Sequence, residues 1–514
     1  MTATSFNANW NTSATATGYQ LDVSTVNTFV SFVSGYSSLV VAGGSTTSQA
    51  VTTLTAGTTY YYRIRATSAS GTSGNSATIS VVTTPSAPVA AAATSVSTNS
   101  FNAVWASSAS ATSYRLDVST TNTFTGGTFV AGYQDVDVGN VLTTPVNGLI
   151  DGTTYYYRVR ALNGSGTSTS SNIITTITAP PAPVASAATS LTQTSFSANW
   201  SAAASATGYR LDVSTDPAFG SFVGVYNNLS AGNVTTLGVT SLAAGTTYYY
   251  RVRATSSSGT SINSSNISAL TISPNPVVAA ATSIGQTTFN ANWSASATAT
   301  GYRLDVATNS AFTGGTFVSG YQDIAISNVT TFAVSSNLAA GTTYYYRVRS
   351  VNASGTSGNS ANGTVTTAPP NPVASAATTF GQTNFTANWA SATTATGYFV
   401  DVAIDAGFTS FVLGYNNLSV GNVLTLVVNN NLTGGTNYFY RVRAASANGT
   451  SGNSNAISLI TVPPPPAALG AGPFAPLSIT ANWSAAPRSN ELSPRRCNGK
   501  YLWRGNICKR LPGP

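Results

Sequence analysis

The stretch that decides the fold is Gly152-Thr-Thr-Tyr-Tyr-Tyr-Arg-Val-Arg160, in which Tyr155, Tyr157 and Val159 alternate with Tyr156, Arg158 and Arg160. The same nine residues begin again at Gly245 and Gly341, and close variants begin at Gly57 and Gly435. A period of two is typical of a β-strand with one face buried. The segment therefore predicts a strand, and its recurrence predicts a tandem repeat.

Tryptophan gives the length of the repeat. Successive markers are 93 to 96 residues apart, at Trp10, Trp105, Trp200, Trp293, Trp389 and Trp483. A Tyr-x-Leu-Asp-Val segment, Tyr-Phe-Val-Asp-Val in the fifth copy, keeps the same period. This length exceeds a solenoid repeat and suits one small β-sandwich. Each repeat is therefore expected to be a separate domain.

Proline clusters and turn residues divide the chain into these domains. We find no helical stripe, so the predicted fold class is all-β: tandem immunoglobulin-like, antiparallel sandwiches arranged as beads on a string. The expected domains are repeat 1 at residues 1–84 with its first strand truncated, repeat 2 at 86–179, repeat 3 at 182–273, repeat 4 at 276–368, repeat 5 at 371–462, a fragment of repeat 6 at 467–486, and an unrelated tail at 487–514.

The composition excludes several classes of function. The chain has 20 basic and 12 acidic residues among 514, and no histidine. Both cysteines lie in the last 28 residues, so the repeats lack thiolate and imidazole groups for catalysis or metal binding. Eleven scattered aspartates do not suggest paired catalytic carboxylates. We therefore expect no enzyme, no catalytic residue, no metal and no cofactor.

The repeat resembles the fibronectin type III domain. The markers that carry the resemblance are Trp105 on the second strand, Tyr114 with Leu116 on the third, and Leu149 leading through Gly152 to Tyr155. The family's fold implies that the Tyr155 hydroxyl reaches back to the backbone as a tyrosine corner. The resemblance covers roughly residues 1–462, and the near-identical, cysteine-free repeats are similar to arrays in bacterial secreted or surface proteins.

The N-terminal end of the chain departs from the repeat pattern. Repeat 1 opens with MTATSF in place of the longer lead-in VAAAATSVSTNSF, so most of its first strand is missing. No signal peptide is visible there, which leaves open an intracellular protein or a start inside a longer gene. The resemblance instead implies an extracellular or cell-surface location.

Charged residues recur at fixed places on the third and sixth strands. Asp117 alternates outward on one strand, and Arg158 and Arg160 alternate outward on the other. Neighbouring strands would join them as surface ion pairs worth roughly 0.2–1 kcal/mol each. The functional alternative is a strip that binds sugars or an anionic polymer, with the outward Tyr61, Tyr156, Tyr249 and Tyr345 as flat faces. We favour the structural interpretation because the charges are sparse.

Three short motifs suggest functions but have simpler explanations. Leu-Asp-Val, as at Leu116, is an integrin-recognition tripeptide, yet alternation would bury its leucine and valine. Asp135-Val136-Asp137 looks like part of a calcium site, but the other repeats lack it, so we interpret it as a solvated turn. Asn-x-Ser/Thr occurs, for example, at Asn163, Asn233, Asn328 and Asn448, where glycans would attach in a eukaryotic secretory pathway. The Thr- and Asn-rich composition explains the number of these motifs equally well.

The tail at residues 487–514 has five Arg, two Lys and one Glu, which accounts for most of the net charge of +8. One interpretation is a small module in which Cys497 and Cys508 close a loop holding Tyr501, Trp503 and Arg504 against an anionic surface. The other, which we favour, is frameshifted or misassembled sequence, because the break falls inside a repeat.

These observations predict a non-enzymatic spacer or adhesion stalk of an extracellular or cell-surface protein. Five sandwiches in line would reach on the order of 170 Å at about 3.3 Å per strand residue. The alternative is a carbohydrate-binding or linker region of a secreted polysaccharide-degrading enzyme. We expect surface polysaccharide or other proteins as partners, no nucleic acid, no membrane span and a monomeric array.

Overall fold

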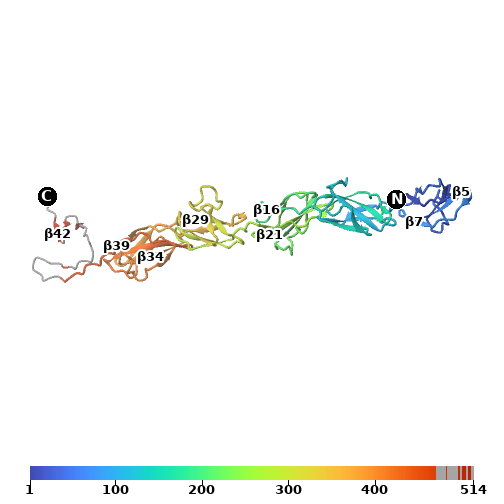
Figure 1. Cartoon of the computed structure of the whole chain (residues 1–514). Helices are drawn as coiled ribbons and strands as arrows, with labels where there is room; N and C mark the ends of the chain where they lie inside the picture. Colours follow the sequence, from blue (N-terminus) through green and yellow to red (C-terminus); the bar gives the residue numbers. More distant parts are fainter. Residues whose placement is uncertain (471–481, 483–495, 498–500, 505–506, 511–514) are drawn as a thin grey trace. The chain divides into compact units, whose positions relative to one another are not determined.

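The computed structural model describes residues 1–470, 482, 496–497, 501–504 and 507–510. Every regular element in these residues is a β-strand, as Figure 1 shows, and no helix there could cross a membrane. The prediction of an all-β fold is confirmed. The chain divides into two compact units, Met1–Leu242 with Thr247–Thr271 and Ala243–Thr246 with Ile272–Pro514.

Repeat 2 shows the arrangement that the complete repeats share. Its strands are β8 (Ala90–Thr94), β9 (Ser100–Trp105), β10 (Ser113–Ser119), β11 (Val136–Gly139), β12 (Thr143–Asn147), β13 (Thr154–Asn163), β14 (Gly166–Thr167) and β15 (Ile174–Ile177). One sheet has the order β12-β9-β8. The other has the order β11-β10-β13-β14, and β15 also pairs with β13. All pairings are antiparallel, as expected for a sandwich.

Repeats 3, 4 and 5 have the same two sheets. Repeat 3 contains β16 (Ala185–Thr189), β17 (Phe196–Trp200), β18 (Gly208–Ser214), β19 (Leu229–Gly232), β20 (Thr236–Val239), β21 (Thr247–Ser256), β22 (Gly259–Thr260) and β23 (Ile267–Leu270). Repeat 4 contains β24 (Val278–Thr282), β25 (Phe289–Trp293), β26 (Gly301–Ala307), β27 (Ile324–Ser327), β28 (Thr331–Val334), β29 (Thr343–Asn352), β30 (Gly355–Thr356) and β31 (Gly363–Thr366). Repeat 5 contains β32 (Ala374–Thr378), β33 (Phe385–Trp389), β34 (Gly397–Ala403), β35 (Leu418–Gly421), β36 (Thr425–Val428), β37 (Asn437–Ser446), β38 (Gly449–Thr450) and β39 (Ile457–Ile460).

Repeat 1 has one strand fewer in its smaller sheet. Its strands are β1 (Phe6–Asn9), β2 (Gly18–Ser24), β3 (Leu39–Ala42), β4 (Ser48–Val51), β5 (Thr59–Ser68), β6 (Gly71–Thr72) and β7 (Ile79–Val82). The smaller sheet contains only β1 and β4 among the described residues, where the other repeats have three strands.

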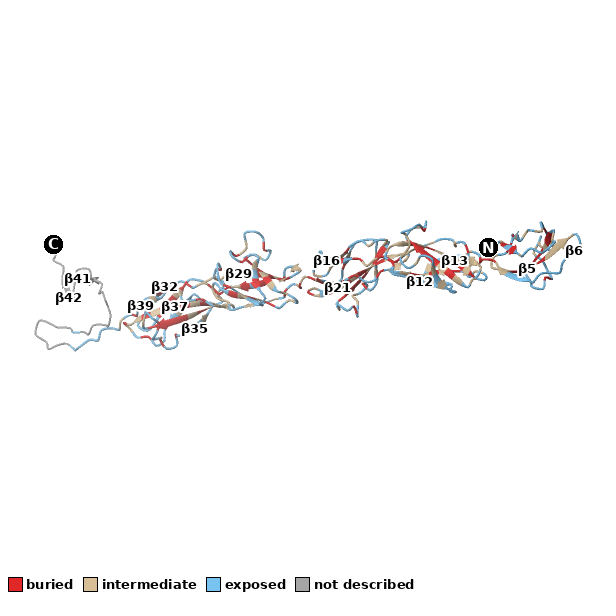
Figure 2. Cartoon of the chain, viewed as in Figure 1, coloured by how far each residue is buried: buried red, intermediate tan, exposed pale blue. Residues whose placement is uncertain are grey.

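Each repeat has its own hydrophobic core, which Figure 2 shows as buried strand segments. On β13 the residues alternate as predicted: Tyr155, Tyr157 and Val159 are buried, while the arginines between them are partly exposed. Trp105 packs with its ring centroid 5.7 Å from that of Tyr114. Five separate cores agree with five separate sandwiches.

The tyrosine corner implied by the family resemblance is present. The Tyr155 hydroxyl accepts a hydrogen bond of 2.9 Å from the backbone N–H of Ile150, five residues upstream. Tyr60 and Tyr438 accept the same bond from Thr55 and Thr433. The bond fixes the connection into the sixth strand, where the long alternating segment begins.

Consecutive repeats within one unit meet through glycine. Gly152, the first residue of the fold-deciding stretch, has φ +57 and lies so close to repeat 3 that an added Cβ would be 3.1 Å from Ser205 Oγ. In repeat 3, a Cβ on Gly259 would be 3.5 Å from the Ala179 Cβ of repeat 2. Gly341 and Gly449 occupy the same places between repeats 4 and 5. The recurring glycine therefore allows both the left-handed backbone before the sixth strand and the close contact between neighbouring repeats.

A buried asparagine strengthens the first joint. Asn163 Nδ2 donates to the Thr83 carbonyl of repeat 1 and to Ser110 Oγ, both at 3.0 Å. Its side chain comes from the end of β13, so the bond links the core strand of repeat 2 to the connecting segment. Because this carbonyl is removed from water, the bond contributes more than an exposed one.

Candidate functional site

One aspartate and two arginines recur on neighbouring strands in every repeat. In repeat 2, Asp117 on β10 lies opposite Arg158 on β13. Arg158 Nε is 2.9 Å and Arg160 Nη2 is 3.1 Å from Asp117 Oδ2. The predicted cross-strand pairs are therefore present. The same contacts join Asp22 to Arg63 and Arg65, Asp212 to Arg251 and Arg253, Asp305 to Arg347 and Arg349, and Asp401 to Arg441 and Arg443.

The aspartate is buried, and the expectation of an ion pair on the open surface was wrong. Asp117 is only 1% exposed, although it alternates with the core residues Leu116 and Val118. The segment between β10 and β11 covers it, and the backbone N–H of Asp135 donates to Asp117 Oδ1 at 2.7 Å. Two guanidinium groups and one amide thus replace the water that the carboxylate loses.

A phenylalanine completes the cluster in each repeat. The Arg158 Cζ atom lies 4.4 Å from the ring centroid of Phe124, an attractive cation–π geometry. Phe124 has φ 51, a backbone conformation that bulky residues rarely adopt. The equivalent residues, Phe29, Phe219, Phe312 and Phe408, also have positive φ and stack on an arginine. The stacking helps to hold the covering segment in this conformation.

This geometry favours the structural interpretation over a sugar- or anion-binding strip. The side chains of Arg158 and Arg160 are 28% and 25% exposed, and both donate to the buried carboxylate. Tyr156 is half-buried beside them, as are Tyr61, Tyr249 and Tyr345 in their repeats. A ligand would have to compete with Asp117 for the guanidinium groups. The cluster is built to tie the covering segment to the sheet.

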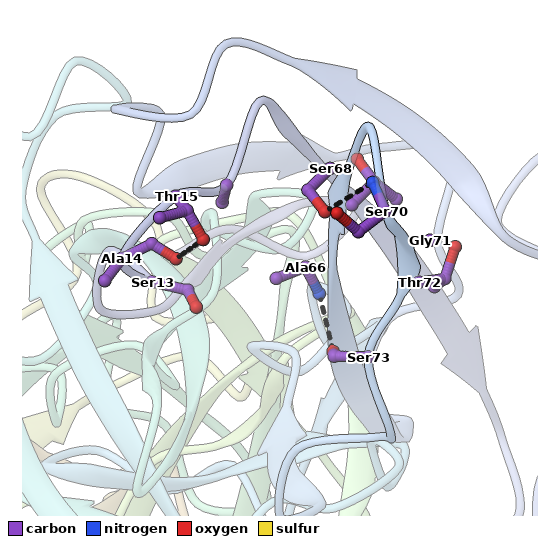
Figure 3. Close-up of a pocket in the computed structure, with 11 residues that line it drawn as sticks. Ser13, Ala14, Thr15, Ala66, Ser68, Ser70, Gly71, Thr72 and Ser73 are labelled. Carbon is purple, nitrogen blue, oxygen red and sulfur yellow. Dashed lines mark hydrogen bonds between the residues drawn. The ribbon is translucent and has the colours of Figure 1, made fainter.

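A shallow pocket of about 320 Å³ lies at one end of repeat 1, between Ser13–Ala16 and Ala66–Ser73 (Figure 3). Small and hydroxyl side chains line it, and several of its polar groups bond to one another: Ser73 Oγ accepts from the Ala66 N–H at 2.9 Å. In repeat 2 the corresponding surface meets repeat 1, where a Cβ on Gly166 would lie 3.2 Å from Thr84 Cγ2. The pocket therefore lies on the surface of repeat 1 that is equivalent to the one with which repeat 2 contacts its neighbour.

A second hollow was missed by the sequence reasoning. An open groove of about 390 Å³ runs beside Trp10 and is lined by Tyr62, Ile64 and Ile79. Trp10 is partly exposed, whereas Trp105 is 2% exposed. The sequence signal for this groove is the short lead-in MTATSF, which replaces the segment that forms a third strand in the smaller sheet of the other repeats.

A model of the fibronectin type III domain matches residues 86–177, 180–270 and 274–366, more than half of the chain. The chain belongs to the fibronectin type III family. The matches fall on repeats 2, 3 and 4, and repeat 5 has the same sheet order. Fibronectin type III repeats are typical of extracellular and receptor proteins and of modules attached to enzymes.

The chain is also similar to parts of two larger proteins. It is 28% identical over 341 residues to the receptor-type tyrosine-protein phosphatase eta of Gallus gallus, covering 64% of this chain and 22% of that protein. It is 29% identical over 279 residues to exoglucanase B of Cellulomonas fimi, covering 50% of this chain and 24% of that protein. The chain thus spans less than a quarter of either relative.

Among solved structures, the chicken CNTN1 FN1–FN3 domains cover 55% of this chain and 99% of their own. The sequence identity is 20% and the TM-score is 0.24.

The Leu-Asp-Val tripeptide is inaccessible in these fibronectin type III repeats. Leu116 and Val118 are fully buried, and Asp117 is the buried carboxylate of the cluster. A binding partner would reach it only by unfolding β10. The expectation that alternation hides the motif is confirmed, and the aspartate is hidden as well.

The Asp135-Val136-Asp137 segment does not form a cation site. Asp135 pairs with Arg115 at 3.2 Å and with Arg160 at 2.8 Å. Asp137, in the edge strand β11, accepts hydrogen bonds from the Ser113 hydroxyl and the Gly139 N–H, and these bonds lower the pKa of its carboxyl. Among the described residues, no three His, Cys, Asp or Glu side chains converge as metal ligands. Asp135 lies in the bend before β11, whereas Val136 and Asp137 belong to this edge strand, so the interpretation as a solvated turn is corrected for these two residues.

The glycosylation motifs differ in accessibility. Asn163 is buried and its amide is used in the joint, so a glycan there is incompatible with the folded repeat. Asn233 and Asn328 are exposed, and Asn448 is half-buried. The asparagine of the motif at Asn163 therefore has a structural role in the joint between repeats 1 and 2.

The tail forms a small antiparallel sheet from β40 (Arg496–Cys497), β41 (Tyr501–Arg504) and β42 (Ile507–Arg510), in the order β40-β41-β42. The side chains of Cys497, Cys508, Trp503 and their neighbours lie outside the described part of the structure. Both interpretations of residues 487–514 stay predictions, and most of the expected fragment at 467–486 also lies outside the described residues.

Proposed function

We propose that the chain is a non-enzymatic structural spacer and adhesion stalk of an extracellular or cell-surface protein, of the kind found in bacterial arrays. The observation that carries this proposal is the recurring joint, in which a glycine of one repeat meets the next at Gly152 and Gly341. The equivalent glycine of repeat 1, Gly57, meets repeat 2 in the same way. A joint built three times from the equivalent glycine suits a chain that must hold its repeats in a fixed order. The absence of histidine also supports a role without catalysis.

Small-angle scattering on the whole chain tests the spacer. An extended array about 170 Å long has a radius of gyration of about 50 Å, by the strand lengths above. A compact globule of the same chain length would have a radius of gyration of about 24 Å. A value near the smaller figure would contradict the proposal.

A joint variant sharpens the same test. In Gly152→Val the added side chain cannot fit against Ser205, and the left-handed φ is strained. The expected result is a broader distribution of particle lengths. Gly148→Val is a matched control, since Gly148 also has positive φ but nothing within 4 Å of an added Cβ.

The second candidate function is a carbohydrate-binding or linker region of a secreted polysaccharide-degrading enzyme. The similarity to an exoglucanase supports it. It predicts that the chain is retained on insoluble polysaccharide and that retention falls when Arg158 and Arg160 are both replaced by alanine. The spacer proposal predicts no retention that depends on Arg158 and Arg160, because both arginines donate to Asp117, so the paired variant separates the two.

A further inference from the structure

Arg210 of repeat 3 is the one arginine in residues 1–470 that forms no ion pair with a carboxylate of the described residues. Every other arginine there lies within salt-bridge distance of an aspartate. The Arg210 guanidinium donates one hydrogen bond, from Nη1 to the Asn228 carbonyl at 3.1 Å. Because a guanidinium has five N–H donors and this side chain is only half-buried, donors remain for a partner outside the chain.

Repeat 4 shows which group fills this place. Arg303 on β26 corresponds to Arg210 and lies opposite Arg349 on β29. The Asp323 carboxylate bridges the two guanidinium groups, with Oδ2 2.9 Å from Arg303 Nη1 and Oδ1 2.8 Å from Arg349 Nη2. Asp135 bridges the equivalent pair of repeat 2, at 3.2 and 2.8 Å. Because like charges opposite each other on paired strands repel, the bridging carboxylate stabilises this part of the sheet.

In repeat 3 the two arginines are present, but the residue at the bridging position is Asn228. Arg210 lies opposite Arg253, and Asn228 Oδ1 accepts a hydrogen bond from Arg253 Nη2 at 2.9 Å. An amide has one oxygen where a carboxylate has two, and it carries no charge, so it cannot bridge both guanidinium groups in the same way. Asp212 does not replace the missing carboxylate, because its two oxygens already accept from Arg251, Arg253 and a backbone N–H. Arg210 is therefore without the anion that its counterparts have.

Repeats 1 and 5 lack the whole arrangement. Their residues at the two positions are Gln20 with Ser38 and Phe399 with Asn417. In every repeat except repeat 3, the arginine is thus either accompanied by a bridging aspartate or absent. The bridging position has positive φ in all five repeats, a conformation that asparagine and aspartate tolerate, so Asn228 changes the charge and keeps the backbone.

We propose that Arg210 binds a carboxylate side chain from an acidic protein segment, beside the exposed amide of Asn228. The guanidinium fork suits bidentate contact with a carboxylate, and Arg253 on the next strand adds positive charge. A protein partner is favoured over an acidic polysaccharide because β19, which follows Asn228, pairs on one side only among the described residues. Its open edge can receive the main chain of the segment that carries the carboxylate. The proposal goes beyond the spacer function and does not depend on it, since it concerns one position in one repeat.

The test measures, by fluorescence anisotropy, binding of the whole chain to a short peptide of alternating alanine and aspartate with an uncharged fluorophore. Arg210→Gln copies the residue of repeat 1 and should weaken binding about tenfold, as expected for the loss of one hydrogen-bonded ion pair. Arg303→Gln is the matched control in repeat 4, where Asp323 already pairs with the arginine, and should leave the affinity unchanged. Both variants keep the basic tail, so binding there cannot produce the difference. No weakening by Arg210→Gln, or equal weakening by both variants, would overturn the proposal.

Exchanging the residue at the bridging position should move the site. Asn228→Asp supplies the carboxylate within repeat 3 and should abolish the binding that depends on Arg210. Asp323→Asn removes the carboxylate from repeat 4, leaves Arg303 without its partner and should create a second site of similar affinity. Asn228 is exposed and Asp323 is 48% exposed, so neither change disturbs a core. Unchanged peptide binding in either variant would contradict the site.

Two further probes identify the class of partner. The same peptide with asparagine in place of aspartate should show no binding that depends on Arg210, and equal binding of the two peptides would overturn the proposal. Sodium polygalacturonate presents carboxylates on a sugar backbone that cannot pair with β19, so it should bind more weakly than the acidic peptide. Binding of polygalacturonate at Arg210 without binding of the peptide would overturn the protein partner and assign the site to an acidic polysaccharide. No saturable binding of either probe would overturn the site itself.

Discussion

Repeats 1 and 2 share their core motifs and differ by one strand. Both place a tryptophan beside a tyrosine, with ring centroids 5.4 Å apart for Trp10 and Tyr19 and 5.7 Å for Trp105 and Tyr114. Only Trp105 is fully covered, because β8 pairs with β9. A strand of five small residues, without any recognisable motif, therefore decides whether the tryptophan of the repeat is covered.

The largest expected effect comes from the cluster that both repeats share. Asp117→Ala leaves Arg158 and Arg160 without their carboxylate and frees the covering segment. We expect it to lower the free energy of unfolding of repeat 2 by about 3 kcal/mol, allowing for the partial exposure of the arginines. Hydrogen exchange read by mass spectrometry resolves the repeats. Asp22→Ala should have the same effect on repeat 1, because the cluster does not involve the missing strand.

Asp135→Asn is the control for this prediction. Asp135 is 49% exposed, and asparagine occupies the equivalent places at Asn228 and Asn417. The change should cost about 0.5 kcal/mol or less. A similar loss of stability from Asp117→Ala and Asp135→Asn would show that burial of the carboxylate is unimportant.

Restoring the missing strand should remove the difference between the repeats. The chain with residues 181–194 in place of residues 1–4 buries Trp10 and Ile79. Its repeat 1 should gain about 2 kcal/mol in free energy of unfolding, the value for covering one large apolar side chain. Denaturant unfolding followed by hydrogen exchange measures it, and an unchanged repeat 1 would contradict the account.

Removing one hydroxyl should affect the two repeats unequally. Tyr157 donates to the Ala91 carbonyl of β8 and accepts from the Val104 N–H of β9, so Tyr157→Phe removes a link between two strands and should cost about 1.5 kcal/mol. Tyr62→Phe removes a bond beside an open groove, where water can replace it, and should cost about 0.5 kcal/mol. Equal costs would argue against the open groove.

The smallest effect is a dependence on alkaline pH. Burial raises the pKa of Tyr157, Tyr250, Tyr346 and Tyr440. Unfolded tyrosines ionise near pH 10, so stability is fully present below about pH 10 and falls as pH rises through the higher folded pKa values. Thermal unfolding of repeats 2 to 5 should shift downward as pH rises above about 10, and less so when Tyr157 is phenylalanine.

The alternation of Tyr155, Tyr157 and Val159 made the strand, the core face and the sandwich predictable from sequence. The burial of Asp117 was not predictable, because it depends on a covering segment with no periodic pattern. The stacking of Phe124 likewise depends on a left-handed backbone that phenylalanine rarely adopts. The short lead-in MTATSF predicted a reduced first strand, but the groove beside Trp10 was not predictable, because Tyr62, Ile64 and Ile79 come together to line it only in the folded repeat.

Amide hydrogen exchange of β1 against β9 tests the central comparison most directly. The two strands have the same core neighbours and differ in one pairing partner. Residues 6–9 are expected to exchange at least about tenfold faster than residues 101–104, and this difference should disappear in the chain with residues 181–194 in place of residues 1–4. Equal protection of the two strands in the unmodified chain would contradict this expectation.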